Sequence, residues 1–288
     1  MNHFPLRRAV LAMACVCALM TLAGCERAGR AQEFMDAQAV LRDKPHMQLV
    51  SRDMAQAIAA EAYPSTLQQE ADKGHALDQD AAQLELARAV TRKLVAQAER
   101  MYPLSRGWEW ELHVVNREDV NAWCMAGGKM AMFSGLIELV KGNPDKIAAV
   151  MGHEISHALL EHTRQGMSRD MLLSSGLWIM AKSLKVGAVR SNAIQQELHL
   201  ALQPFNREAE READALGLEL MARAGFDPVE GSQIWRDMGH DTTNAGMQRL
   251  MAFMNDHPMS EERLATLTAL AQKLKSGAAG GATQGAQP

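Results

Sequence analysis

The chain has 288 residues, of which 47% are hydrophobic and 22% are charged, a composition typical of a globular protein with a hydrophobic core. The formal net charge of −4 argues against nucleic acid as a partner, because nucleic-acid interfaces are normally basic. The length suits one large domain or two small ones, and the sequence shows neither an internal repeat nor a linker. We therefore expect one α+β domain, mostly α-helical, with a small β-sheet.

The N-terminus has the pattern of a signal peptide over residues 1–24. Arg7 and Arg8 precede an apolar run over residues 9–22, which is too short to span a bilayer. The run ends in Leu-Ala-Gly before Cys25, which resembles a bacterial lipobox. This resemblance implies cleavage before Cys25 and lipidation of that cysteine. An ordinary secretory signal that happens to contain Cys25 is the alternative.

The residues after the cysteine predict where the protein is anchored. Glu26, rather than aspartate, follows Cys25, and by resemblance to enterobacterial sorting rules this favours the periplasmic face of the outer membrane in a Gram-negative bacterium. Residues 25–47 are expected to form a polar, lipidated tether. Cleavage of the signal peptide would leave Cys124 as the remaining free thiol, so we expect no intramolecular disulfide.

Two helices and two strands are predicted in the first half of the domain. Helical periodicity covers Met54–Tyr63 and Asp78–Tyr102. Lys129–Phe133, after a pair of glycines, is expected to form a short strand. Strict alternation over residues 108–114 predicts another strand, whose one face carries Trp108, Trp110, Leu112 and Val114.

The second half is predicted to be helical. Asn143 as an N-cap and Pro144 at the first helical position predict a helix that continues to about Arg169. The apolar stretch Met171–Val189 is expected to pack on the core as a helix, because Lys182 and Lys185 argue against a membrane span. Contact of this helix with a membrane or a partner is the alternative.

The remaining chain is expected to end in a disordered tail. Asn206 can cap a helix that continues to Ala224 and ends at Gly225 and Pro228. Further helices should follow to about Lys275. Residues 276–288 have low complexity and are predicted to be disordered, which leaves residues 48–275 as the folded domain.

The segment MGHEISHALLEH at residues 151–162 predicts metal chemistry. His153 and His157 are four residues apart, so one face of a helix presents both imidazoles to a single zinc ion. Glu154 is turned by about 100° from His153, which suits a general base for a zinc-activated water better than a ligand. The alternative is a surface helix with solvated histidines. Against it stands a stripe of apolar residues, which predicts a packed helix: Ile147, Val150, Met151, Ile155 and Leu159.

A catalytic zinc also needs a third protein ligand and an open position. Within the helix predicted at residues 206–224, Glu210 lies at the edge of the buried stripe. We therefore choose Glu210 as the third ligand, with a solvated helix charge as the alternative. The other glutamates of this helix are expected to point toward solvent: Glu208, Glu212 and Glu219.

Two further residues share the face of Glu210 on that helix. Asp214 lies one turn further on, where it could bond a ligand histidine or the water network of the site. Gly217 would let this helix approach another helix closely. Both residues therefore belong to the predicted surroundings of the metal.

The motif G-H-E-x-x-H, followed some fifty residues later by E-x-x-A-D, resembles peptidase family M48. This family includes the CAAX prenyl protease, the HtpX protease and periplasmic BepA-type proteases. The resemblance covers about residues 80–270. Asn121-Ala122 and Gly127-Gly128-Lys129 match the family's segment before the metal helix, and His257-Pro258 with Arg263 matches a late H-P-x-x-x-x-R motif.

The resemblance implies a gluzincin-type zinc metalloprotease domain with one Zn²⁺ per chain. Its ligands would be His153, His157 and Glu210. Glu154 would be the general base, and Asp214 a supporting or proton-donating acid. The chain departs from the family at Ala126, where proline is usual, and at Asn206, where many relatives have serine.

The resemblance also suggests how a substrate could bind. Gly128, Lys129, Met130 and Ala131 would begin an exposed edge strand over the active-site cleft, where an extended peptide pairs. An internal strand is the alternative.

Two more histidines and one cysteine have other expected roles. His257 has three candidate roles: stabilising an oxyanion, occupying the open zinc position as a fourth ligand, or a structural role. His162 is expected to be a polar residue near a helix end, and Cys124 an inert small residue.

The sequence as a whole predicts a lipid-anchored zinc endopeptidase of the bacterial envelope. Its substrates would be misfolded or stalled envelope proteins, an expectation that comes from the family and from the predicted location. The alternative is a periplasmic chaperone or assembly factor that uses the zinc structurally and works with the outer-membrane protein assembly machinery. A helical protein in which the motifs occur by chance is a further alternative.

Overall fold

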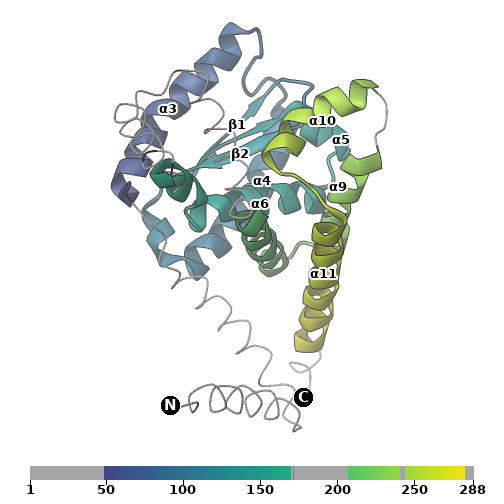
Figure 1. Ribbon diagram of the computed structural model, residues 1–288. Helices are drawn as coiled ribbons and strands as arrows, with labels where there is room; N and C mark the ends of the chain where they lie inside the picture. The colour runs from purple at the N-terminus through teal and green to yellow at the C-terminus, as the bar shows by residue number, and fades with distance from the viewer. Residues whose placement is uncertain (1–48, 170, 172–206, 241–243, 283–288) are drawn as a thin grey trace, which may run out of the picture. The chain divides into compact units, whose positions relative to one another are not determined.

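The computed structural model describes residues 49–169, 171, 207–240 and 244–282 (Figure 1). The chain divides into two units, Met1–His46 and Met47–Pro288, and the described residues belong to the second. The predicted signal peptide, the predicted tether and most of the predicted helix Met171–Val189 lie outside the described residues. None of the helices in the described ranges combines the length and the apolar character that crossing a membrane requires.

Two long helices open the described unit. Helix α3 (Arg52–Asp72) begins where the Ser51 hydroxyl accepts a hydrogen bond from the Met54 N–H. It continues through Pro64, so the predicted end at Tyr63 was too early. Helix α4 (Ala81–Met101) begins at Asp80, whose carboxylate caps two backbone N–H groups, and it confirms the prediction. The short 3₁₀ helix η2 (Pro103–Gly107) follows.

A three-stranded sheet forms the middle layer. It contains β1 (Glu111–Val115), β2 (Ala122–Met125) and β3 (Lys129–Phe133) in the order β1-β3-β2. Strand β3 pairs with β1 in parallel and with β2 antiparallel. Successive side chains of β3 point to opposite faces. Met130 and Met132 join the core shared with α4 and α6, whereas Ala131 and Phe133 pack with Tyr63 and Leu67 of α3.

The sheet order corrects the prediction that Gly128, Lys129, Met130 and Ala131 form an exposed edge strand. Strand β3 is central, because both of its edges are hydrogen-bonded. The edge on the side of helix α6 is β2 instead. The Phe133 N–H donates to the Asn121 carbonyl at 2.9 Å. By the alternation of antiparallel pairs, the backbone N–H and C=O of Cys124 therefore project from the outer edge of β2.

Helices α5 (Ser134–Leu139) and α6 (Pro144–Leu159) follow the sheet. The Asn143 side chain caps α6 at the N–H groups of Asp145 and Lys146, as its sequence predicted. The apolar stripe of α6 is buried, which confirms the prediction of a packed helix: Ile147, Val150, Met151, Ile155 and Leu159.

Helix α6 ends earlier than expected. The prediction of one helix to Arg169 was wrong, because Glu161 adopts a left-handed conformation with φ of 60°. A separate helix then covers residues 162–169. Arg52 and Arg164 both bind the Glu161 carboxylate, which offsets the cost of a non-glycine residue in this conformation.

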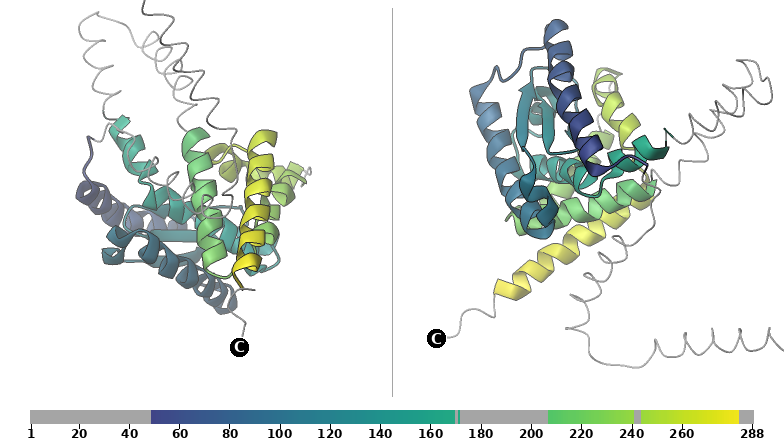
Figure 2. Two further views of the ribbon diagram at one scale, coloured as in Figure 1. Left: turned by 90° about the horizontal axis from the view of Figure 1, so that it is seen from below. Right: turned by 90° about the vertical axis from the view of Figure 1, so that its left-hand side faces the viewer.

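The C-terminal helices complete the unit. A helix over residues 207–223 ends before Gly225, whose φ is 85°. Figure 2 shows this helix beside α11 (Glu261–Ala282). Because α11 continues to Ala282, the prediction of disorder from residue 276 was wrong as far as residue 282. The other two helices of this part are α9 (Pro228–His240) and α10 (Asn244–Asp256).

Candidate metal centre

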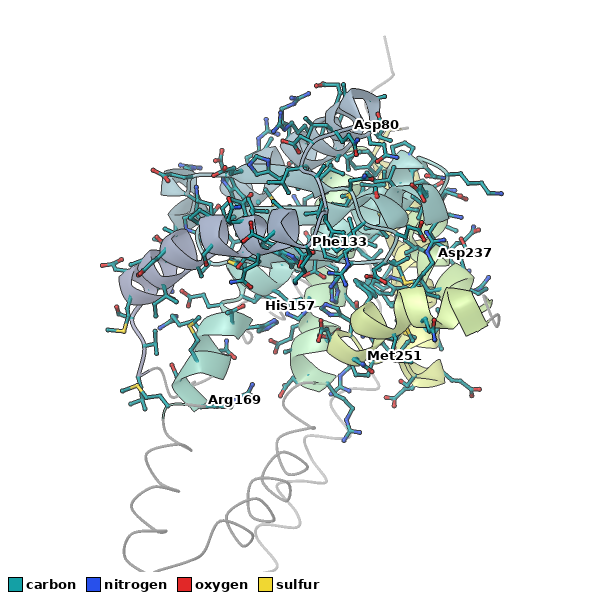
Figure 3. The ribbon with its side chains drawn as sticks, turned by 90° about the horizontal axis from the view of Figure 1, so that it is seen from above. Asp80, Phe133, His157, Arg169, Asp237 and Met251 are labelled. Atoms are coloured by element: carbon teal, nitrogen blue, oxygen red, sulfur yellow. The ribbon has the colours of Figure 1, made fainter. Side chains whose placement is uncertain are left out.

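Three segments bring four potential metal ligands together. His153 and His157 come from α6, Glu210 from the helix at residues 207–223, and His257 from the residue after α10. One donor atom of each lies within 4.8 Å of the donor atoms of the other three. His157, labelled in Figure 3, marks the place where these segments converge. The structure thus brings together the three predicted ligands and His257.

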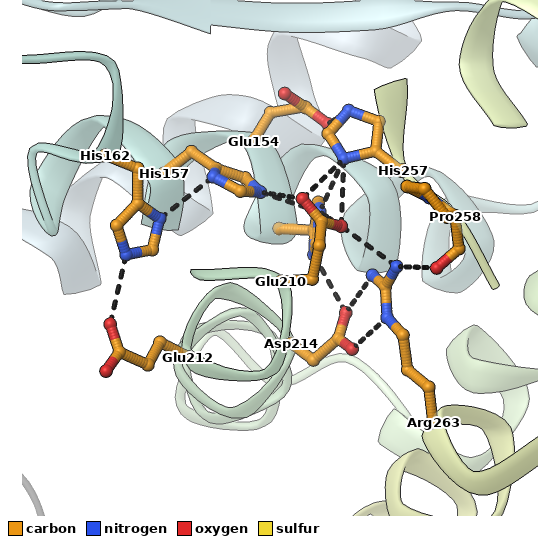
Figure 4. Close-up of polar contacts among 10 residues, drawn as sticks. Glu154, His157, His162, Glu210, Glu212, Asp214, His257, Pro258 and Arg263 are labelled. Atoms are coloured by element: carbon orange, nitrogen blue, oxygen red, sulfur yellow. Dashed lines mark hydrogen bonds and ion pairs between the residues drawn. The ribbon is translucent and has the colours of Figure 1, made fainter. Parts of the chain in front are cut away.

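The donor atoms of this cluster face a common centre (Figure 4). The Nε2 atom of His153 lies 3.0 Å from His157 Nε2 and 3.2 Å from His257 Nδ1. The Glu210 carboxylate lies 3.2 Å from His157 Nε2 and 3.1 Å from His257 Nδ1. Ring nitrogens repel one another at these distances unless a proton or a cation lies between them. Imidazole nitrogens with one carboxylate are a donor set that zinc binds in proteins, so these residues fit the expected metal.

A close helix crossing brings Glu210 within reach of the two α6 histidines. A Cβ atom at Gly217 would lie 2.7 Å from the His153 backbone nitrogen, and one at Gly152 would lie 2.9 Å from the Gly217 carbonyl oxygen. Only glycine at both positions permits this separation of α6 and the helix at residues 207–223. The structure confirms the prediction that Gly217 allows a close approach.

Asp214 and Arg263 support the cluster from one side. The Asp214 Oδ1 atom lies 2.9 Å from His153 Nδ1, and Arg263 donates to both Asp214 oxygens at 2.6 and 2.8 Å. Burial raises the pKa of Asp214, but hydrogen bonds from Arg263 and His153 outweigh it and lower the pKa overall. An ionised carboxylate with both oxygens engaged orients His153. Of the two roles left open for Asp214, this geometry favours the supporting one.

Arg263 also links Asp214 to the ligand glutamate. Its Nη1 atom lies 2.9 Å from Glu210 Oε2, and its guanidinium lies over the Trp235 ring at 5.3 Å. The side chain is 6% exposed. A buried, planar guanidinium thus holds the carboxylates of Glu210 and Asp214 in fixed positions.

Glu154 lies beside the donor cluster without belonging to it. Its carboxylate is buried, and Oε1 lies 3.3 Å from His257 Nε2 but has no hydrogen-bond partner among the described residues. Burial raises the pKa of Glu154, and the charges of His257 and His153 partly oppose this. A buried carboxylate next to a metal site, with one oxygen that makes no hydrogen bond to the described residues, suits a proton acceptor.

The electrostatics of the cluster favour a cation at its centre. Burial raises the pKa of Glu210, but hydrogen bonds from His153, His157 and His257 outweigh it, so the pKa is strongly lowered. Burial would lower the pKa of His153, yet Asp214 and Glu210 raise it to about 10. Burial lowers the pKa of His157 to about 3, against the opposing effect of Glu210. Glu210 therefore stays ionised, and its negative charge favours a cation at the centre.

His162 and Glu212 also lie next to this site, a position that the sequence did not predict for either residue. His162 Nδ1 lies 2.9 Å from His157 Nδ1, and His162 Nε2 lies 3.1 Å from Glu212 Oε2. The prediction that Glu212 and Glu219 point to solvent was wrong, since their side chains are 12% and 5% exposed. The helix at residues 207–223 is covered on more than one face, which its apolar stripe alone did not reveal.

Known proteins resemble this chain over much of its length. Metalloendopeptidase OMA1 from Schizosaccharomyces pombe is 34% identical over 54% of this chain and 45% of its own length. Metalloprotease YcaL from Escherichia coli is 25% identical over 74% of this chain and 85% of its own. The beta-barrel assembly-enhancing protease of Yersinia pestis is 23% identical over 58% of this chain and 35% of its own. The chain spans less than half of the OMA1 proteins it matches.

The family match covers the whole donor cluster. Peptidase family M48 matches residues 80–271, a range that contains α4, the sheet, α6 and the segments that carry Glu210, His257 and Arg263. The prediction of zinc as the cofactor is confirmed by this match together with the donor cluster. The chain belongs to peptidase family M48, a family of zinc metallopeptidases.

Proposed function

We propose that the chain is a zinc-dependent endopeptidase, with the metal held by His153, His157 and Glu210. The observation that carries this proposal is the position of Glu154, whose buried Oε1 atom makes no hydrogen bond to the described residues and lies 3.3 Å from His257 Nε2, beside the donor cluster. When bound, zinc supplies a Lewis acid that lowers the pKa of water and polarises a peptide carbonyl. Glu154 takes the proton of the attacking water and then delivers it to the leaving amine.

The outer edge of β2 is the proposed binding strand for an extended peptide. It replaces β3, whose two edges are both paired. Helix α6, which carries Glu154, packs against β2, and the Cys124 backbone groups project from the outer edge. A peptide that pairs there would gain main-chain hydrogen bonds with little dependence on its sequence. This mode of binding suits unfolded polypeptide segments.

Removing the third ligand tests the metal site. Glu210→Ala should bring the zinc content of the purified protein close to zero, because two histidines without a carboxylate give an incomplete site. Zinc content by atomic absorption is the measurement. Glu85→Ala, which removes an exposed glutamate of α4 paired with Arg92, is the control and should keep the zinc content of the parent. Full zinc occupancy in Glu210→Ala would exclude Glu210 as the third ligand.

His257 is proposed to restrain the enzyme. Its Nδ1 atom faces the donor centre and its Nε2 atom faces Glu154, so the ring fills space between the ligands and the base. His257→Ala should keep the metal, since three ligands remain, and should raise the turnover of an unfolded protein substrate. A fall in turnover by orders of magnitude would indicate oxyanion stabilisation instead. Unchanged turnover with a lower melting temperature would indicate a structural role.

We further propose that the enzyme acts at the bacterial envelope, anchored by a lipid on Cys25. The supporting observations are the Arg7-Arg8 and apolar pattern before Cys25 and the bacterial relatives from Escherichia coli and Yersinia pestis. The substrates would be misfolded or stalled envelope proteins. We include β-barrel proteins of the envelope among them, because the Yersinia pestis relative is named a beta-barrel assembly-enhancing protease.

The lipid anchor has its own test. Cys25→Ser should move the protein from the membrane fraction to the soluble fraction and stop the incorporation of labelled palmitate, because the acylated thiol is lost. Cys124→Ser, which changes a buried cysteine of the folded unit, should leave both readouts unchanged. Membrane association of Cys25→Ser would place the anchor in the uncleaved apolar run or in Met171–Val189.

A further inference from the structure

We infer that His162 and Glu212 are positioning residues that fix the tautomer and the orientation of His157 as a zinc ligand. The inference rests on the zinc site of the proposed function. His162 lies between the two residues, with Nδ1 at 2.9 Å from His157 Nδ1 and Nε2 at 3.1 Å from Glu212 Oε2. Figure 4 shows the contacts that join His157 to His162 and His162 to Glu212, on the side of His157 away from His257.

The break between α6 and the next helix places His162 there. In one continuous helix, a residue five positions after His157 would lie about 140° around the axis and face away from it. The left-handed Glu161 instead ends α6, and the chain turns so that the two rings meet at a centroid distance of 4.9 Å. The Gln165 side chain donates to the Leu160 carbonyl, which the break leaves without its helical partner. The turn is therefore stabilised by polar contacts on both sides.

The geometry allows one arrangement of the ring hydrogens of His157 and His162. His157 Nε2 faces the donor centre, at 3.2 Å from Glu210 Oε1, so a neutral His157 that binds metal there carries its hydrogen on Nδ1. His157 Nδ1–H then donates to His162 Nδ1. This leaves the hydrogen of His162 on Nε2, where it donates to Glu212. A carboxylate at the outer end is the group that favours this arrangement.

Burial makes the arrangement specific. The His162 side chain is 7% exposed and that of Glu212 is 12% exposed, so water has little access to replace either hydrogen bond. The two ligand histidines are thus supported in different ways. Asp214 bonds His153 directly at 2.9 Å, whereas Glu212 acts on His157 through His162.

The test compares zinc affinity in variants of the full chain. His162→Phe keeps a ring but removes the acceptor, and it should weaken zinc binding by about 10- to 100-fold, measured by competition with a chromogenic chelator. His162→Gln offers an amide oxygen to His157 and an amide N–H to Glu212, so it should restore binding to within a fewfold of the parent. The visible absorption bands of bound Co²⁺ should change in His162→Phe and return in His162→Gln.

The controls separate positioning from general stability. His113→Phe removes a histidine of β1 that lies 2.7 Å from Asp78 and 3.2 Å from Glu111; it breaks a comparable pair away from the site and should leave zinc affinity unchanged. Glu212→Leu is the second variant, in case His162→Phe does not fold, and should weaken zinc binding severalfold. If His162→Phe and Glu212→Leu both bind zinc as tightly as the parent does, whatever their melting temperatures, this inference is wrong and the proposed function is unaffected. A parent protein that binds no zinc would overturn the proposed function as well.

Discussion

Glu154→Gln should keep the fold and the bound zinc but lower the turnover of an unfolded protein substrate by about 10²- to 10⁴-fold. The amide has nearly the same shape as the carboxylate and cannot accept the proton of the attacking water. Because Glu154 is not one of the clustered donors, its replacement leaves the ligand set intact. Cleavage of casein and zinc content, measured on the same preparation, give the two readouts.

The matched control changes an exposed acid outside the site. Glu138→Gln removes a charge at α5 whose partner is Arg249, at 3.5 Å, and should keep the parent's turnover. Activity that survives in Glu154→Gln, or in protein freed of metal, would come from another source. The same variant separates an enzyme from an assembly factor with a structural zinc, since only the enzyme should lose its effect on envelope proteins.

Gly217→Ala should lower both the melting temperature and the zinc affinity. The added methyl group would lie 2.7 Å from the His153 nitrogen and 2.9 Å from the Gly152 carbonyl carbon, and backbone atoms cannot rotate away as a side chain can. Forcing extra volume into a packed contact costs about 1–3 kcal/mol. The displaced helix would also carry Glu210 away from His153 and His157. Thermal unfolding with and without zinc measures both effects.

Gly166→Ala is the matched control for this substitution. Gly166 lies in the helix at residues 162–169, and among the described residues a Cβ atom there would contact only the end of the Arg169 side chain, at 3.8 Å. Alanine is favoured over glycine within a helix by up to about 1 kcal/mol, so this variant should match or exceed the parent's stability. A Gly217→Ala protein as stable as Gly166→Ala would show that the two helices can separate without cost.

The sequence predicted those features that depend on neighbours along one helix. His153 and His157 share a face because they are four residues apart, and Gly217 shares a face with Glu210 because they are seven residues, or about two turns, apart. These relations need no knowledge of the tertiary fold, and the structure places these side chains as helical geometry requires. The hydrophobic stripe of α6 belongs to the same class of prediction.

Features set by distant segments could not be predicted in this way. Strand β3 became central because β1 pairs with it in parallel and the four-residue β2 covers its other edge; β2 is too short to show a clear alternation. The left-handed conformation at residue 161 is usually marked by glycine, but this position is a glutamate. The sequence therefore predicts a continuous helix across the turn that brings His162 to His157. The sequence pattern points Glu212 toward solvent, whereas the turn at Glu161 brings His162 Nε2 to 3.1 Å from its carboxylate.

Three of the acidic residues in the helix at residues 207–223 have different partners around the centre. Glu210 faces the donor centre, Glu212 bonds His162, and Asp214 bonds His153 and Arg263. Any translation or rotation of this helix would displace all three carboxylates together. We therefore expect the centre to assemble cooperatively, because the contacts that hold His153 and those that hold His157 both depend on the position of this one helix.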